Sequence, residues 1–254
     1  MKNLIDIINL SKSFGSHVVL KDVSLQVEES ENFVVFGQSG TGKSVLLKCI
    51  VGLLQPDAGE IYIKGTNVLN LSQKELNQAR KNIGFLFQGA ALYDSMSVRE
   101  NLEFPLIRNF NFTSKEREEK VKTVLENVSL EEAIDKMPSE LSGGMKKRIG
   151  LARSIIAEPK LMLYDEPTTG LDPITSKEIS SLILELQKSL KMTSIVVTHD
   201  LLCAEIIADR AIVLNEGIVQ YEGTIPELTS SLDPFLRNFF SHEIIEEQNR
   251  STNE

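Results

Sequence analysis

The chain has no apolar stretch long enough to cross a membrane, and it is poor in cysteine. No uninterrupted apolar run approaches the ~20 residues that a transmembrane helix needs, and Met1 to Asn9 lacks the basic start and apolar core of a signal peptide. We therefore expect a protein of the cytosol. The two cysteines, Cys49 and Cys203, match no metal-ligand or redox spacing, so we interpret them as small buried apolar side chains.

Basic residues are also too few for a protein whose main task is to grip nucleic acid. The sequence has 27 Lys and Arg against 36 Asp and Glu, a formal net charge of -9. This balance disfavours binding to phosphate backbones, so we predict no nucleic-acid partner. Its length of 254 residues suffices for one sizeable domain with at most a smaller inserted lobe, and 41% apolar and 25% charged residues are typical of a folded protein.

Short β-branched runs alternate with segments of helical periodicity. Four apolar runs are typical of buried strands: residues 33–36, 83–87, 161–164 and 194–197. This alternation predicts an α/β fold with a parallel core sheet flanked by helices. Shorter runs predict an additional N-terminal antiparallel β lobe: residues 4–9, 23–27 and 61–63.

Strand signals disappear from about Val98 to Ala157. Within this stretch, residues 114–128 carry charges on one face and apolar side chains on another, as amphipathic helices do. We therefore predict a helical lobe, at about 98–157, inserted in one domain of residues 1–240. Residues 241–254 are polar, acidic and poor in aromatics, so we expect a frayed or partner-dependent C-terminal tail.

An apolar stripe precedes that tail. Asp233 and Pro234 can begin a short helix, which would place Phe235, Leu236, Phe239 and Phe240 on one stripe. Two coverings are open: the stripe packs on its own domain, or the chain end reaches a neighbouring copy.

Residues 37–44 match the pattern G-x-x-x-x-G-K-[ST] of a phosphate-binding loop. A predicted strand precedes this segment and a predicted helix, residues 44–51, follows it, which is the context that separates the motif from a mere Gly-rich turn. Glycines let backbone N–H groups point at the β-phosphate, Lys43 reaches the β- and γ-phosphates, and Ser44 can ligate Mg²⁺. The sequence therefore predicts binding of ATP and Mg²⁺ by the following residues: Gly37, Gln38, Ser39, Gly40, Thr41, Gly42, Lys43, Ser44 and Val45.

Two carboxylates follow the apolar run 161–164. They are predicted to stand at the carboxyl edge of the sheet, where α/β folds bind ligands. Asp165 suits the Mg²⁺ shell, through water, and Glu166 suits the base that orients and deprotonates the attacking water. Taken alone, such a pair is more often a helix cap or a solvated turn. The phosphate-binding loop favours the catalytic interpretation.

A second loop of small residues opens another predicted helix, residues 146–157. Ser142, Gly143 and Gly144 repeat the logic of an anion site, with exposed N–H groups at a positive helix end. Because this loop lies in the helical lobe, far along the chain from the first, the simplest arrangement is a two-fold homodimer in which each loop faces the other. Considered alone, this loop would be interpreted as a flexible segment at the start of a helix.

Together, these segments resemble the ABC ATPase family, in order, over about residues 4–222. The resemblance implies a P-loop NTPase fold and ATP hydrolysis coupled to transport. It also implies roles for individual residues. Phe14 would stack on adenine, and Gln88 would link Mg²⁺ and water to the membrane partner. Leu171-Asp172 would form a dimer-facing loop, and His199 would sense the γ-phosphate as a switch. Without the other motifs in this order, we would interpret Phe14 as a core residue and Asp172 as a helix cap. Gln88 and His199 would be interpreted as hydrogen-bonded polar residues.

A narrower set of segments is similar to the MlaF-type ATPases of Mla/Mce lipid transport systems: residues 87–93, 101–106, 141–145, 170–176 and 233–240. Two positions depart from the usual family pattern. Met145 stands where the signature loop has Gln, which affects a side-chain contact, and Ser30 replaces a frequent Gly but can still hold a turn. Neither change removes a phosphate donor.

The narrower resemblance implies partners at the cytoplasmic side of the bacterial inner membrane. They are integral-membrane permease subunits, a Mce-domain lipid-binding protein and, in some systems, a small regulatory subunit. Apolar side chains within residues 89–106 would receive a permease helix, unless they form lobe core. Two other functions stay open: an amino-acid or ion importer ATPase, and a soluble ABC ATPase acting on nucleic acid or ribosomes, which the acidic balance and the single ATPase unit disfavour.

Overall fold

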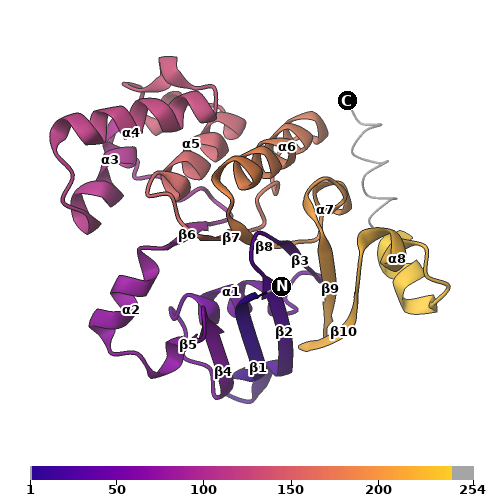
Figure 1. Cartoon of the computed structure of the whole chain (residues 1–254). Helices are drawn as coiled ribbons and strands as arrows, with labels where there is room; N and C mark the ends of the chain where they lie inside the picture. Colours follow the sequence, from indigo (N-terminus) through magenta and orange to yellow (C-terminus); the bar gives the residue numbers. More distant parts are fainter. Residues whose placement is uncertain (1, 242–254) are drawn as a thin grey trace.

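The computed structural model describes residues 2–241, in which two sheets and a group of helices are packed together (Figure 1). The first sheet is the antiparallel β lobe, with strand order β2-β1-β4-β5. Its strands are β1 (Asn3–Phe14), β2 (His17–Glu28), β4 (Ala58–Ile63) and β5 (Thr66–Asn67). The expected N-terminal β lobe is therefore confirmed.

The second sheet is the core of the molecule, with strand order β10-β9-β3-β8-β7-β6. Its strands are β3 (Asn32–Phe36), β6 (Ile83–Leu86), β7 (Leu161–Asp165), β8 (Thr193–Thr198), β9 (Arg210–Asn215) and β10 (Ile218–Gly223). Every residue of β3, β7 and β8 is buried, as strands covered on both faces require. The parallel pairing of the four predicted strands β6, β7, β8 and β3 is confirmed. The sequence patterns indicated neither β9, which pairs parallel to β3, nor the antiparallel edge strand β10.

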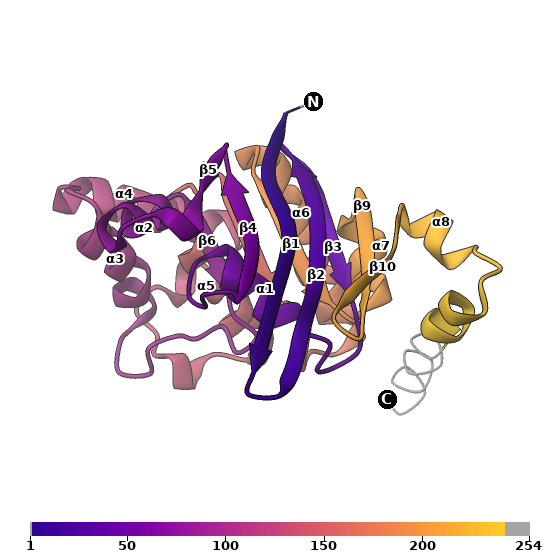
Figure 2. The same ribbon diagram turned by 90° about the horizontal axis from the view of Figure 1, so that it is seen from below.

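Two apolar clusters hold these layers together. One fills the space between the β lobe and a face of the core sheet, where α1 (Lys43–Ile50) contributes Leu46, Leu47 and Ile50. The other lies on the opposite face, under α5 (Gly143–Ile155), α6 (Pro173–Leu190) and α7 (Leu201–Ile207). Figure 2, turned by 90°, shows β1 and β2 in front of α1 and the core sheet. The helix that follows the phosphate-binding loop is thus sandwiched between two sheets.

The helical lobe is built from α3 (Val98–Asn109), α4 (Ser114–Asn127) and α5 (Gly143–Ile155), joined through the 3₁₀ turns η2 (Glu131–Ala133) and η3 (Pro138–Glu140). Capping boxes begin α3 and α4, because Ser97 and Thr113 each accept from a backbone N–H three residues on, and Glu100 and Glu116 reach back. Between the lobes lie η1 (Val68–Asn70) and α2 (Gln73–Arg80). No helix within residues 2–241 is long and apolar enough to cross a bilayer.

The apolar stripe near the C-terminus packs on its own domain. After α8 (Ile225–Thr229), a helix covers residues 234–241, and its Leu236, Phe239 and Phe240 are buried in the cluster under α7. Phe240 meets Phe36 edge-on, with ring centroids 5.4 Å apart. Of the two coverings considered for the stripe, the intramolecular one is therefore present. Of the predicted polar tail at 241–254, Ser241 is exposed and helical, and residues 242–254 lie outside the described residues.

Candidate functional site

The phosphate-binding loop connects the carboxyl end of β3 to the start of α1. Gly40 and Gly42 have φ of 84° and 100°, in the left-handed region that favours glycine. A Cβ on Gly42 would also lie 2.9 Å from the side chains of Val19 and Leu20 on β2. Because no side chain caps α1, its first N–H groups remain available beside the loop. This geometry suits a bound phosphate.

The loop and the end of β7 meet directly. The Ser44 hydroxyl donates to Asp165 Oδ1 at 2.7 Å. Lys43 Nζ donates to the carbonyl oxygens of Gly37 and Gln38 and lies 3.3 Å from Glu166 Oε1. The fold therefore brings the predicted phosphate loop and the predicted acidic pair into contact, as their places at the carboxyl edge of the sheet indicated.

Glu166 stands between two nitrogen-bearing side chains. Its second oxygen, Oε2, lies 2.8 Å from His199 Nδ1, at the end of β8, and accepts from the Thr169 hydroxyl at 3.2 Å. Burial alone would raise the pKa of Glu166, but the hydrogen bond to His199 and the charge of Lys43 outweigh burial and hold that pKa below its usual value. The carboxylate is therefore ionised at neutral pH and able to accept a proton.

A pocket of about 420 Å³ opens in front of these groups. Phe14, from the end of β1, and Gln88, just after β6, line it together with Lys43, Ser44, Glu166 and His199. The ring of Phe14 is half-exposed, as a surface for stacking requires. Sequence reasoning missed Val19, which lines the pocket from β2. Only the pairing of β1 with β2, which sets Val18 beside Ser13, brings that residue near Phe14.

The donor set at the pocket fits Mg²⁺ held mainly through phosphate and water. Among the described residues, no group of three or more His, Cys, Asp or Glu side chains forms a metal cage. Instead, the Ser44 hydroxyl and the Asp165 carboxylate adjoin each other, and Gln88 offers an amide oxygen from the pocket wall. Mg²⁺ in nucleotide sites is bound by one or two carboxylates plus phosphates and waters, which matches this set.

The second glycine loop lies outside this pocket. Ser142 caps α5 by accepting from Met145 N–H at 3.2 Å, so the helix begins at Gly143 rather than at residue 146 as predicted. Ser142 and Gly143 are exposed, and a Cβ on Gly144 would lie 2.8 Å from Thr175 Cγ2, near the start of α6. The two glycine loops of a single chain therefore do not line the same pocket, and Ser142 and Gly143 of the second loop are exposed.

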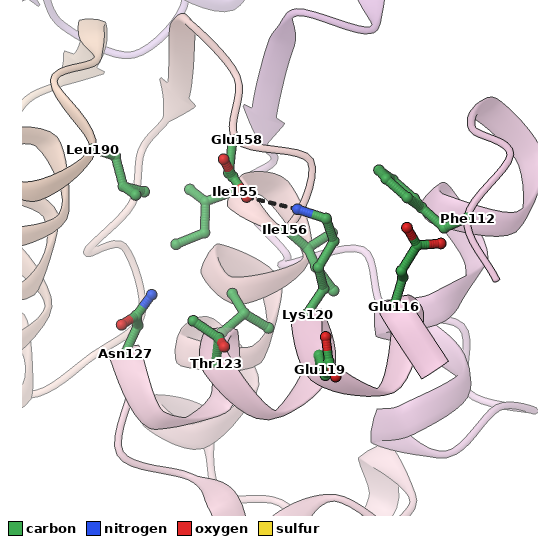
Figure 3. Close-up of a pocket in the computed structure, with 11 residues that line it drawn as sticks. Phe112, Glu116, Glu119, Lys120, Thr123, Asn127, Ile155, Ile156, Glu158 and Leu190 are labelled. Carbon is green, nitrogen blue, oxygen red and sulfur yellow. Dashed lines mark hydrogen bonds and ion pairs between the residues drawn. The ribbon is translucent and has the colours of Figure 1, made fainter. Parts of the chain in front are cut away.

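A separate hollow of about 330 Å³ lies on the helical lobe, between α4, the end of α5 and Leu190 (Figure 3). Its rim carries Glu119 and a Lys120–Glu158 ion pair of 2.6 Å, while Ile155 and Ile156 form part of its floor. None of the predicted site residues lines it. The predicted site residues Phe14 and Lys43 line the pocket of about 420 Å³ instead.

The family described as "ABC transporter" matches residues 20–169, and the chain belongs to that family. It is the ATP-binding subunit of an ABC transporter, an ATPase whose hydrolysis is coupled to transport. One curated relative, the intermembrane phospholipid transport system ATP-binding protein MlaF of Haemophilus influenzae, is 41% identical over 91% of this chain and 88% of its own length.

Other relatives carry different names. Protein TRIGALACTOSYLDIACYLGLYCEROL 3, chloroplastic, of Arabidopsis thaliana is 42% identical over 93% of this chain and 73% of its own length. The methionine import ATP-binding protein MetN of Carboxydothermus hydrogenoformans is 40% identical over 82% of this chain and 61% of its own. The dimeric cassette MJ0796, solved in a post-hydrolysis state with ADP and Pi, superposes with a TM-score of 0.79 at 33% identity over 87% of this chain and 98% of its own.

Proposed function

We propose that this ATPase drives the movement of phospholipid or a related lipid between membranes through a Mla/Mce-type complex. The observation that carries the proposal is the likeness to MlaF, which extends over 91% of this chain and 88% of the relative. The likeness to MetN is comparable in identity but covers only 61% of that relative. The match therefore covers more of the phospholipid-system ATPase than of the methionine-import ATPase. Methionine or another small solute is the second candidate cargo.

In the proposed site, each group has one task. Phe14 stacks on the base, and Lys43 and the loop N–H groups hold the phosphates. Mg²⁺, when bound by Ser44, Asp165 and Gln88, neutralises phosphate charge. In the nucleotide-bound site, the phosphates then compete with the Glu166 carboxylate for contact with the Lys43 ammonium.

Glu166 then takes the proton of the attacking water. His199, which contacts the same carboxylate 2.8 Å away, keeps it aimed and lies near the terminal phosphate. The lining of one pocket by Lys43, Glu166 and His199 supports the proposal, but the open side of the nucleotide would still need a cover.

That cover is proposed to be a second copy of the chain. Ser142 and Gly143 are exposed at the N-terminus of α5, where the positive end of a helix favours an anion. Ser142 to Gly144 of one copy would close over the phosphates held by the other copy, so that a homodimer carries two composite sites. The exposed Asp172, which caps α6 by accepting from Thr175 N–H at 2.9 Å, would lie at the same interface.

A permease helix is proposed to dock in a groove on the helical lobe. This groove of about 200 Å³ is lined by aromatic side chains that include Phe85, Tyr93, Phe104 and Phe110, and also by the basic side chains of Arg80, Lys81 and Arg153. The rings of Tyr93 and Phe104 are 5.0 Å apart, and Tyr93 is exposed. Gln88 lines the nucleotide pocket and stands in the chain between Phe85 and Tyr93 of the groove. Movement of the permease helix would therefore be transmitted through this segment to the phosphates.

The remaining partners and the location follow from the same resemblance. A Mce-domain protein and a small regulatory subunit would complete the complex, with this chain peripheral on the cytoplasmic side of a bacterial inner membrane.

The test is affinity purification of the tagged chain from detergent-solubilised membranes, with bound proteins and lipids identified by mass spectrometry. The matched control is the Phe104→Asp variant, which should capture less permease. Capture of a Mce-domain protein with phospholipid supports lipid transport. Capture of a permease with a solute-binding protein and no Mce domain would favour the import of a small solute.

A further inference from the structure

Lys147 is a buried cation that none of the predicted roles uses. It lies one turn into α5 and is 6% exposed. Its ammonium donates to two main-chain carbonyl oxygens, that of Gln88 at 2.5 Å and that of Glu166 at 3.3 Å. Burial lowers the pKa of Lys147, while the charges of Glu166 and Asp165 oppose that shift. A lysine held this deep needs a structural or functional reason.

The two carbonyl groups belong to segments that are far apart in the sequence. Gln88 follows β6 at the joint between the core sheet and the helical lobe, and Glu166 follows β7 in the core. Lys147 itself belongs to the helical lobe, four residues after Gly143. One ammonium group therefore joins the lobe, the joint and the end of the catalytic strand.

The backbone of Glu166 is in a conformation that requires support. Its φ is 50°, in the left-handed region that a residue with a side chain enters rarely. On one side, Glu166 N–H donates to Val197 O at 2.9 Å, on β8. On the other side, its carbonyl accepts from Lys147. These two bonds hold the peptide units that flank the carboxylate, and so fix the direction in which the carboxylate leaves the chain.

We propose that Lys147 is a positioning residue, which holds the backbone of Glu166 and of Gln88 so that the carboxylate of Glu166 is aimed at the attacking water. This inference deepens the proposed role of Glu166 and rests on it. Lys147 is not among the residues that line the pocket at Phe14 and Lys43, so we expect it to act on the rate of hydrolysis and not on ATP affinity. Because the same ammonium is carried by α5, a shift of the helical lobe against the core is transmitted to both carbonyls.

The test compares Lys147→Met with wild type in the full-length chain. Met keeps the length and the apolar stem of Lys but has no donor. Loss of hydrogen bonds from a charged donor predicts a fall in kcat of about 10- to 100-fold. ATP affinity, measured with a fluorescent nucleotide, should stay within about threefold, since no nucleotide contact is removed. Lys147→Arg, which keeps several N–H donors, should recover part of the lost rate.

The matched control is Lys122→Met, the same replacement on an exposed face of α4, where the rate should not change. An unchanged kcat in Lys147→Met overturns the proposal. So does a parallel loss of kcat, ATP affinity and thermal stability, because that pattern marks general damage. Lys147→Arg with no recovery also counts against it.

A double-mutant cycle separates this inference from the assignment of Glu166. If Lys147 acts through Glu166, Lys147→Met added to Glu166→Gln lowers the residual single-turnover rate no further. An additive loss would mean that Lys147 acts elsewhere. If Glu166→Gln alone keeps its rate, the base assignment fails, independently of what Lys147→Met does.

Discussion

His199 and Glu166 face each other at the carboxyl ends of β8 and β7, with Nδ1 and Oε2 2.8 Å apart. The other carboxylate oxygen lies 3.3 Å from Lys43 Nζ. His199 thus holds one oxygen of the carboxylate and Lys43 contacts the other. A group held in this way loses little freedom when it acts, which is what a positioned general base requires.

Replacing Glu166 with Gln should abolish turnover and leave nucleotide binding in place. The amide has the same shape and keeps polar contacts but cannot take a proton. We expect ATP-bound dimers to accumulate, as detected by sedimentation with ATP. Glu119→Gln, on the exposed surface of α4, is the control and should hydrolyse ATP normally. Undiminished hydrolysis by Glu166→Gln would show that another group is the base.

Replacing Lys43 with Ala should act on a different quantity, the affinity for nucleotide. Lys43 is 6% exposed and would meet the phosphates directly, so its loss removes a charge-assisted contact. Such contacts contribute about 1.5–3 kcal/mol, which corresponds to a roughly 10- to 150-fold rise in Kd. Equilibrium titration with a fluorescent nucleotide measures it. An unchanged Kd would remove Lys43 from the binding set.

A composite site makes two inactive variants complementary. Lys43→Ala damages the phosphate loop, and Ser142→Arg blocks the exposed loop at the start of α5. A heterodimer of the two has one intact composite site and one doubly damaged site, so ATP hydrolysis should exceed that of either variant alone. Differently tagged subunits and two-step purification supply the heterodimer. No recovery in proven heterodimers would argue against a shared site or require both sites to work together.

Much of this site could be predicted because its residues follow strands that share one edge of a parallel sheet. The phosphate loop after β3, the acids after β7 and His199 after β8 all converge for that reason. The helical start at Ser142 was placed too late, because Gly143 and Gly144 are poor helix formers that the Ser142 cap compensates.

Other features could not be predicted, because they depend on tertiary contacts with no local pattern. β9 lies beside β3 although β6, β7 and β8 of the same sheet come between them in the sequence. In the sequence, Lys147 looks like one more basic residue of an amphipathic helix. Only the folded chain brings the carbonyl groups of Gln88 and Glu166 to its ammonium. Val19 likewise enters the pocket only through hairpin pairing.

Phe104→Asp should uncouple transport from ATP hydrolysis. Phe104 is half-buried beside Tyr93 in the groove of the helical lobe, so a carboxylate there would repel an apolar permease helix without opening the main core. We expect the isolated subunit to keep its thermal stability and its ATPase rate, while transport in reconstituted vesicles falls. Ile107→Asp, on an exposed position of α3, is the control. An insoluble Phe104→Asp subunit would identify Phe104 as core.

Both thiols should be inert in the native protein. Burial raises the pKa of Cys49 to about 11 and that of Cys203 to about 12, and both side chains are almost fully buried. Because the thiolate is the reactive form, a raised pKa leaves very little of it at pH 8. We expect no reaction with a disulfide reagent at that pH, and two equivalents after unfolding. Ser95→Cys, at an exposed position, is the positive control. A native thiol reacting as fast as Ser95→Cys would contradict the buried interpretation.

The helix at residues 234–241 should be needed for the stability of the ATPase domain itself. Phe240 is 3% exposed and stands edge-on to Phe36, the residue just before the phosphate loop. Truncating a buried Phe to Ala costs about 3–5 kcal/mol, so Phe240→Ala should lower Tm by roughly 6–20 °C in a domain of this size. Leu232→Ala, at an 81% exposed position, is the matched control and should leave Tm unchanged.

Two C-terminal deletions also test whether the helix at residues 234–241 stabilises the domain. Removing everything from Ser231 onward takes Leu236, Phe239 and Phe240 out of the apolar cluster and should destabilise or aggregate the protein. Removing only residues 242–254 spares that cluster and should leave both Tm and ATP binding unchanged. Thermal unfolding followed by circular dichroism compares the two. Equal stability of both truncated chains would mean that the helix at 234–241 contributes little to the fold, despite its burial against Phe36.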